Sequence, residues 1–174
     1  ADDADLYFQL SRAESWMVEE GEVKSGSFAI DQGVGVRVVS GEKTAFAYAD
    51  DISPDSLEAA ARVTRAIAAQ GADASAPAPG LRVAKPLYAP VDPVAGLDDA
   101  EKIRLLGRLE AAARAADPRV RQVIGRLSGE YEVVLVARAD GVRSADVRPL
   151  VNLSVTVIAE QDGRREQGYC GGGG

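Results

Sequence analysis

The sequence predicts an α+β fold in which a mainly antiparallel sheet and two helices packed on one of its faces form a two-layer sandwich. Three observations support this prediction. Apolar and polar residues alternate in two separate blocks of the chain, short turns containing glycine interrupt each block, and two stretches with helical spacing lie between them. The 174 residues fit one domain, which we expect to span residues 1–170.

The first third of the chain is expected to form a β-meander. Leu6, Phe8 and Leu10 alternate with polar residues, which is the period of a half-buried strand. Strands joined by short turns with glycine are most simply antiparallel. Further strands are expected around Trp16-Met17-Val18, around Val23, at residues 34–38 and, after a turn at Ser40-Gly41, at residues 45–49, where Phe46 and Tyr48 project opposite to three alanines.

A first helix is predicted to begin after Ser53. Ser53 can cap the helix, Pro54 fits its first position, and Asp55 favours the positive end of the helix dipole. Gly71 can end the helix in a left-handed conformation. The residues expected on its packed face are small and recur at helical spacing: Leu57, Ala60, Ala61, Thr64, Ile67 and Ala68.

Residues 72–96 hold five of the eight prolines and no regular pattern, which predicts a surface crossover within the domain. Its length is unusual for a passive loop, so we expect part of it to pack on the domain. The residues expected to do so are Leu81, Val83, Leu87 and Tyr88.

The second helix is predicted to begin at Asp98, which forms a capping box with Glu101, and to end before Pro118. Its expected apolar face is Ile103, Leu106, Leu109 and Ala113. Strands should follow at residues 120–124 and 131–137 and, centrally in the sheet, at residues 151–159, with turns at Ser128-Gly129, Asp140-Gly141 and Asp162-Gly163 and a last short strand after them.

Composition excludes several classes of function. A net charge of -7 disfavours direct binding to a nucleic acid backbone. There is no histidine to serve as a base or metal ligand, and the lone Cys170 can form no internal disulfide. The most apolar run, residues 150–159, is too short to cross a bilayer. An acidic start differs from a secretory signal. We therefore expect a cytoplasmic location and no membrane partner.

The remaining motifs favour structural roles. Gly33-Val34-Gly35 lacks the third glycine of a phosphate-binding loop and lies within a strand pattern, so it indicates a bulge or close packing. The carboxylate clusters Asp2-Asp3-Asp5, Glu19-Glu20-Glu22 and Asp50-Asp51 lie at turns and at the chain start, where solvated charges are common. Arg143, Arg148, Arg164 and Arg165 form a modest basic group, interpreted as a solvated sheet face or a contact with an acidic domain.

Several longer strings resemble the amino-terminal domain of the TldD/PmbA family. They occur in the family's order and cover essentially the whole chain. The strings are residues 5–9 (DLYFQ), 22–28 (EVKSGSF), 33–37 (GVGVR), 41–48 (GEKTAFAY) and 146–151 (DVRPLV), followed by the glycine-rich end after residues 163–166.

This resemblance implies a cytoplasmic zinc metalloprotease, of a kind once described as a modulator of DNA gyrase, in which a TldD-type subunit pairs with a PmbA-type subunit and cuts unfolded peptides. The implied zinc motif, His-Glu-x-x-x-His, follows the glycine-rich stretch and is missing from this chain. We therefore assign no catalytic, cofactor-binding or metal-ligating residue here. Residues 171–174 would begin a linker to a carboxy-terminal metalloprotease domain.

The sequence also suggests two alternative functions. The chain could be a stand-alone module that binds peptide by adding a strand to a sheet edge. A regulator acting directly on DNA is disfavoured by the net charge of -7. A reading frame that continues past Gly174 into the zinc motif would favour the protease, and a stop codon near Gly174 would favour the module.

Overall fold

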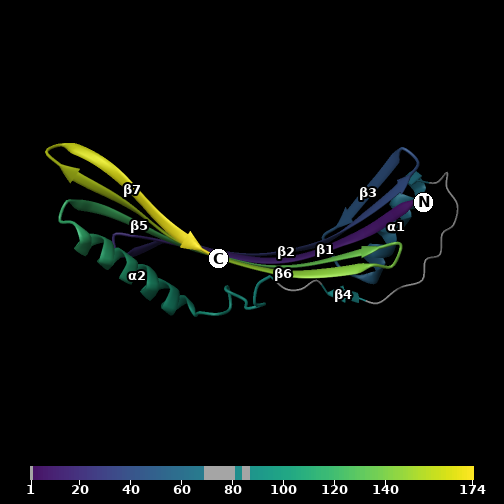
Figure 1. Ribbon diagram of the computed structural model, residues 1–174, viewed down its shortest axis with the longest axis horizontal. Helices are drawn as coiled ribbons and strands as arrows, with labels where there is room; N and C mark the ends of the chain where they lie inside the picture. Colours follow the sequence, from purple (N-terminus) through teal and green to yellow (C-terminus); the bar gives the residue numbers. More distant parts are fainter. Residues whose placement is uncertain (1, 69–80, 84–86) are drawn as a thin grey trace. The chain divides into compact units, whose positions relative to one another are not determined.

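A computed structural model describes residues 2–68, 81–83 and 87–174, and this part of the chain contains a seven-stranded sheet and two α-helices (Figure 1). The strands are β1 (Asp3–Glu19), β2 (Glu22–Ser40), β3 (Lys43–Ala49), β4 (Leu81–Val83), β5 (Val120–Arg138), β6 (Arg143–Gln161) and β7 (Arg164–Gly173), and the helices are α1 (Pro54–Ala68) and α2 (Asp99–Ala116). The strand order is β3-β2-β1-β5-β6-β4, and β7 also pairs with β6.

The predicted α+β class and mainly antiparallel sheet are confirmed. Strand β2 pairs with β3 and β6 pairs with β7 in antiparallel fashion, whereas the short β4 is parallel to β6. The expectation that both helices share one face of a two-layer sandwich stays a prediction.

The chain divides into two compact units. Unit 1 comprises residues 1–11, 30–89 and 132–148, and unit 2 comprises residues 12–29, 90–131 and 149–174. Strands β1, β2, β5 and β6 each contribute residues to both units. The first block of strands therefore consists of fewer and longer strands than predicted, because β1 and β2 continue where the apolar pattern weakens.

The predicted turn at Ser128-Gly129 is wrong, since β5 runs unbroken through it. A side chain at Gly129 would meet the Cγ2 atom of Val94 at 3.6 Å and the Cγ atom of Glu14 at 3.7 Å. These are ordinary van der Waals distances, so the strand could also accommodate a small side chain here, and the glycine does not turn the chain. The turns predicted at Ser40-Gly41, Asp140-Gly141 and Asp162-Gly163 are confirmed, and each of their glycines has a positive φ.

Unit 1 buries valines, alanines and a threonine, whereas the aromatic residues of β3 are exposed. Helix α1 begins as predicted, with the Ser56 amide donating to Ser53 Oγ at 3.3 Å. The helix contacts β3, and Ala60 and Thr64 of the helix are buried. Ala45 of β3 is buried, whereas Phe46 and Tyr48 on the opposite face are 62% and 69% exposed. Small side chains on both elements let the helix approach the strand closely. Gly71, the predicted end of the helix, lies outside the described residues.

Gly33 and Gly35 are close-packed within β2, as predicted from the sequence. A Cβ atom at Gly33 would lie 3.0 Å from the backbone oxygen of Ala49, whereas one at Gly35 would lie 3.0 Å from the ring of Phe46.

We expect Gly33→Ala to destabilise the protein by about 1–3 kcal/mol, because the backbone of Ala49 cannot move away from the added methyl group without disturbing the strand. Gly35→Ala should cost under about 1 kcal/mol, since the exposed ring can move. Thermal unfolding of both variants would measure the difference, and equal losses would contradict the predicted contrast.

Unit 2 is built around α2. The predicted capping box is present: the Glu101 amide donates to Asp98 Oδ1 at 2.7 Å, and the Asp98 amide donates to Glu101 at 3.3 Å. The core cluster is Val18, Leu106 and Leu127, with Trp16, Leu105, Leu109, Val151 and Leu153 packed around it. Strand β6 lies between β5 and β7, so its predicted central position is confirmed.

Asp117, at the carboxyl end of α2, offers a test of the local electrostatics. Hydrogen bonds from the side chain and then the backbone of Arg119 lower the pKa of Asp117 from 3.8 to about 2. A lowered pKa means that the interaction stabilises the fold above pH 3.8 and is lost as the pH falls to about 2. An NMR titration should give a midpoint near 2 for Asp117, and Arg119→Gln should move it towards 3.8. A midpoint unchanged by Arg119→Gln would contradict this assignment.

The proline-rich crossover packs differently from the prediction. Residues 69–80 and 84–86 lie outside the described part, but Leu81–Val83 pairs with Arg143–Ala145 of β6. Leu87 and Tyr88, which we expected to pack, are exposed. Val94 is the buried residue instead, because the chain here is held by the polar contacts described below.

Candidate functional site

The carboxylate clusters noted in the sequence are used mainly in local structure. Asp5 pairs with Arg37, and the Asp2 carboxylate accepts a hydrogen bond from the Gly41 amide at 2.6 Å. Asp51 accepts from Ser56 Oγ at 3.0 Å. Hydrogen bonds from Ser53 and Ser56 lower the pKa of Asp51. These contacts tie turns and a helix start, and the structure does not combine the clusters into one site.

The cluster at Glu19-Glu20-Glu22 lies in unit 2 and is also partnered. Glu20 forms an ion pair with Arg114 of α2, with 2.6 Å between Oε1 and Nη2. Glu22 forms one with Lys24, with 2.6 Å between Oε2 and Nζ. Each of these two cations lowers the electrostatic repulsion between the neighbouring carboxylates. The basic group is divided as well: Arg148 pairs with Glu132 and Asp146 in unit 1, and Arg164 pairs with Glu166 in unit 2.

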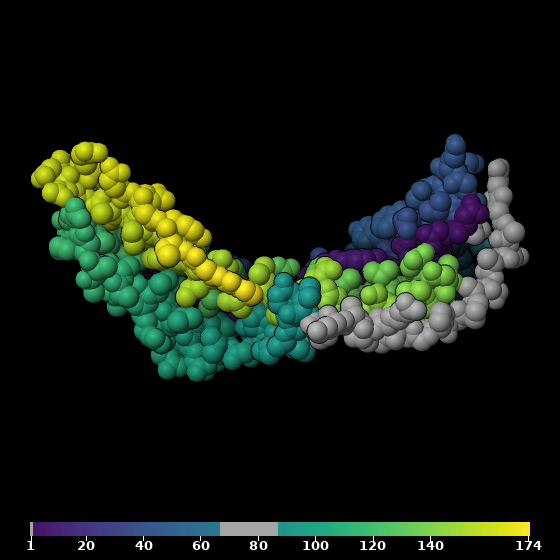
Figure 2. Space-filling view, viewed as in Figure 1, coloured from purple at the N-terminus to yellow at the C-terminus, as the bar shows by residue number. Residues whose placement is uncertain are grey.

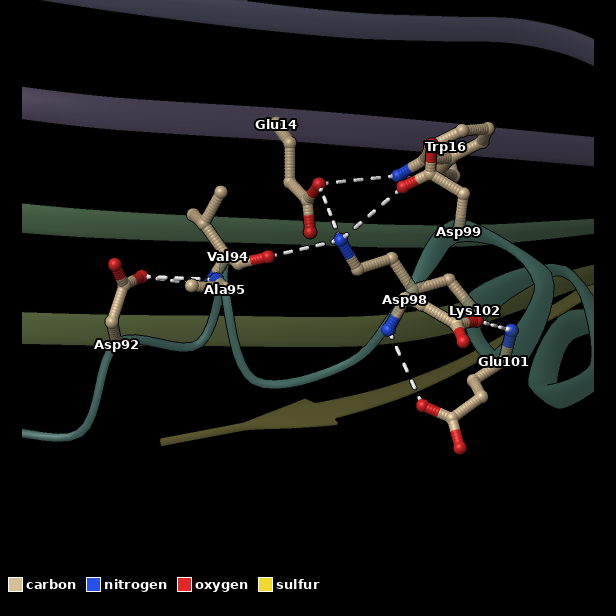
Figure 3. Close-up of polar contacts among 9 residues, drawn as sticks. All are labelled: Glu14, Trp16, Asp92, Val94, Ala95, Asp98, Asp99, Glu101 and Lys102. Carbon is tan, nitrogen blue, oxygen red and sulfur yellow. Dashed lines mark hydrogen bonds and ion pairs between the residues drawn. The ribbon is translucent and has the colours of Figure 1, made fainter.

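Sequence reasoning missed a buried ion pair in unit 2, which Figure 3 shows. Lys102 of α2 and Glu14 of β1 are only 3% and 8% exposed, and Lys102 Nζ lies 2.8 Å from Glu14 Oε2. The same Nζ donates to the carbonyl oxygen of Val94 at 3.0 Å and lies 3.8 Å from Asp99 Oδ1. Trp16 Nε1 donates to Glu14 at 3.4 Å.

A second set of contacts holds the same segment. The Asp92 carboxylate accepts the amides of Val94 at 2.9 Å and Ala95 at 3.3 Å, and it also pairs with Arg12 of β1. The guanidinium of Arg12 lies 5.2 Å from the ring centre of Tyr131, within the range of a cation–π contact. Glu14 and Arg12 of β1 thus hold, through Lys102 and Asp92, the segment that leads into α2.

This cluster is suited to structure rather than chemistry. The Lys102 ammonium donates to the Glu14 carboxylate and to the Val94 carbonyl and is nearly inaccessible to solvent, so it is not available to a substrate. A weak sequence signal was available. Lys102 lies four residues before Leu106, on the helical stripe that continues to Leu109 and Ala113, and a lysine on such a stripe requires a buried partner. Ile103, predicted to be on that stripe, lies at its exposed margin instead.

Unit 1 contains an open hollow of about 530 Å³ on the sheet face that carries Phe46 and Tyr48. Its floor is the backbone of Gly33 and Gly35 in β2. Further lining residues come from β1, from β2 and from the end of β3: Tyr7, Gln9, Ser11, Asp31, Gln32, Val34 and Asp50. The volume falls within the range of small-molecule sites, about 300–1,000 Å³. Figure 2 shows β3, in blue, at the surface.

The donor set of the described residues does not fit a zinc centre. Zinc in proteins takes three or four ligands from Cys, His, Asp and Glu. Across residues 2–68, 81–83 and 87–174, no group of three or more such side chains could hold a metal ion. Cys170 is exposed and lies opposite Val155 in the β6–β7 register. We therefore derive no metal-dependent step on these residues.

Fold and site together describe an α+β protein with a buried structural ion pair and an open, aromatic-lined sheet face. Comparison with known proteins assigns its family. A model described as PmbA/TldA metallopeptidase domain 1 matches residues 4–68, and one described as PmbA/TldA metallopeptidase central domain matches residues 92–174. The chain belongs to the TldD/PmbA family, as the resemblance of its sequence strings predicted.

Curated relatives agree with this assignment. A metalloprotease TldD homolog of Haemophilus influenzae is 49% identical over 99% of this chain, and one of Buchnera aphidicola is 42% identical over 99%. The chain spans 36% of the length of each of these relatives.

Solved structures share the fold at low sequence identity. A Thermotoga maritima protein described as a modulator of a DNA gyrase matches 98% of this chain with a TM-score of 0.80 and 14% identity, over 39% of its own length. TldE from Thermococcus kodakarensis matches 99% of this chain with a TM-score of 0.67 and 17% identity, over 40% of its length. No helix in the described part of the chain is long and apolar enough to cross a membrane.

Proposed function

We propose that this chain is the non-catalytic amino-terminal part of a TldD-type, zinc-dependent metallopeptidase that acts on unfolded peptides. One observation carries the proposal: 99% of the chain is 49% identical to a metalloprotease TldD homolog, although the sequence contains no histidine. The zinc ligands and the catalytic base would belong to a carboxy-terminal domain of the full-length protein. The chain itself would wall the active-site cleft and exclude large folded substrates.

Assembly with a PmbA-type partner subunit and a cytoplasmic location belong to the same proposal. Such contacts could cover two surfaces, which are the exposed aromatic face of unit 1 and strand β7 of unit 2, all of whose residues are exposed. Figure 2 shows β7, in yellow, uncovered in that view. In this proposal residues 1–170 act as one domain, and residues 171–174 begin the linker, although Gly171–Gly173 pair with Asn152–Ser154 of β6.

The proposal is tested by comparing this chain with the full-length protein and its partner subunit. Cleavage of a denatured, fluorescently labelled reporter should require the full-length pair and should stop on addition of a zinc chelator. The chain alone should neither cut the reporter nor bind zinc at submicromolar concentration in isothermal titration. Chelator-sensitive cleavage by the chain alone would contradict the assignment of the chemistry to another domain.

A second candidate function is peptide binding by addition of a strand to a sheet edge. The observation that favours it is that, among the described strands, β3 and β7 each pair on one side only. Peptides methylated on alternate backbone nitrogens would test it, because methylation removes the amide donors that a new strand needs. Equal binding of methylated and unmethylated peptides would exclude this function.

A further inference from the structure

The hollow of unit 1 has a chemistry that none of the polar contacts above uses. Three aromatic residues on its walls are exposed: Tyr7, Phe46 and Tyr48. Aromatic side chains usually lie among the more buried residues, and here alanines take the buried side of β3 instead. The exposed rings therefore give the hollow apolar and π-electron surface that contributes nothing to the core.

The glycines of β2 keep that surface open. Gly35 lies beneath the ring of Phe46, where a Cβ atom would approach ring carbons to 3.0 and 3.1 Å. Gly33 lies beside the backbone of Ala49, where a Cβ atom would approach the carbonyl oxygen to 3.0 Å. Side chains at these positions would fill the floor or displace the ring, so the glycines maintain the hollow as well as the strand packing.

The hollow also carries uncompensated negative charge. By the alternation of a strand, Asp31 continues the face of Gly33 and Gly35, and Asp50 continues the face of Phe46 and Tyr48. Both aspartates are exposed, and neither forms an ion pair in the described part of the chain. The described lining includes no Lys or Arg. Asp5, one strand away, shows the contrast, because Arg37 neutralises it.

Aromatic faces beside free carboxylates attract a cation with an apolar stem. A ring attracts the charged head through its quadrupole, and a carboxylate attracts it directly. Lysine and arginine side chains have this combination of parts, since their methylene stems pack on apolar surface. A phosphate-bearing ligand such as a nucleic acid would be repelled by both aspartates and by the net charge of -7.

We propose that this hollow binds the Lys or Arg side chain of an extended peptide segment. The segment is expected to be extended because β3, the strand that carries Phe46 and Tyr48, is an edge strand in the described sheet and leaves backbone groups available beside the hollow. Gln9, Ser11 and Gln32 supply further hydrogen-bonding groups around it. This binding site goes beyond the proposed function and does not depend on whether the full-length protein cuts peptide.

Fluorescence anisotropy on the full-length protein tests the proposal with three labelled peptides of nine residues. The peptides are rich in Ser and Thr and differ only at the central position, which is Arg, its neutral analogue citrulline, or Glu. The Arg peptide should bind about fivefold more tightly than the citrulline peptide, as expected for a partly desolvated cation–π and ion-pair contact. The Glu peptide should bind most weakly, and added salt should reduce the difference.

Variants locate the binding in the hollow. Asp31→Asn with Asp50→Asn, and separately Tyr48→Ser, should each reduce the preference for Arg over citrulline to less than about twofold. The matched control, Glu42→Gln with Asp162→Asn, removes the same number of charges from exposed positions outside the hollow and should retain the preference. Circular dichroism before and after heating would confirm that each variant is folded, as expected for exposed positions.

The outcomes separate this inference from the proposed function. Equal affinity for the Arg and citrulline peptides, or no binding of either, would overturn the inference while leaving the metallopeptidase assignment untouched. An equal loss in the control variant would also overturn it, because the preference would then come from the overall negative charge. Chelator treatment should leave the Arg preference unchanged, so failure of the zinc-dependent function would not disturb this measurement.

Discussion

Replacing Lys102 by Met is expected to destabilise unit 2 by about 3–5 kcal/mol, the usual effect of removing one partner from a buried ion pair. Lys102 and Glu14 are nearly inaccessible to solvent, and their charged atoms are 2.8 Å apart. The variant would leave the Glu14 carboxylate buried without its cation, and the Val94 carbonyl would lose its donor. Urea denaturation followed by the fluorescence of Trp16, the single tryptophan, reports on this unit because Trp16 contacts Glu14.

The matched control replaces both partners. Glu14→Leu with Lys102→Met removes both charges and should recover most of the lost stability, since apolar residues of similar volume can replace a buried pair at little cost. The double-mutant cycle should therefore give a large interaction free energy between Glu14 and Lys102. A loss below about 1 kcal/mol for Lys102→Met would show that the pair is solvated in solution.

Leu106→Ala should be the most damaging single truncation in the core of unit 2, with a loss of about 2–5 kcal/mol. Leu106 is 0% exposed and belongs to the central cluster with Val18 and Leu127. Its removal leaves a cavity between α2 and the sheet. A Cβ atom at Gly125 would lie 3.3 Å from the Leu106 side chain, so the strand backbone lies directly beneath this residue.

Ile103→Ala on the same helix provides the comparison. Ile103 is 36% exposed, so the same kind of truncation removes less buried surface and should cost about 1 kcal/mol or less. Both variants introduce alanine, the best helix former, so a change in helix propensity does not account for a loss of stability. Similar losses for the two variants in urea denaturation would show that the packed face of α2 is not the one described here.

Local signals in the sequence predicted the helices well. Each helix start is marked by a capping residue, which is Ser53 before Pro54 in one helix and Asp98 three residues before Glu101 in the other. A cap bonds backbone groups only a few residues away, so it can be recognised in the sequence without knowledge of distant contacts. The turns at Asp140-Gly141 and Asp162-Gly163 are local in the same way, because they require backbone conformations with positive φ.

Glycines inside strands were harder to interpret. Gly129 resembles a turn signal in the sequence, yet it lies within β5, which runs unbroken through it. The same residue type marks a turn when its φ is positive, as at Gly141, and a close approach within a strand when a neighbouring atom leaves no room for a side chain, as at Gly33. Only the neighbour's position distinguishes the two cases.

The family, the α+β class, the helix starts and the hairpin turns could be predicted from the sequence, because strings, alternation and capping are properties of neighbouring residues. Which face of each strand is buried depends on tertiary packing. This packing placed alanines against α1 and left Phe46 and Tyr48 exposed around a hollow, and it brought Glu14 to Lys102 from distant parts of the chain. Burial and charge pairing depend on what packs opposite a residue, and alternation alone marks two faces without saying which one another element covers.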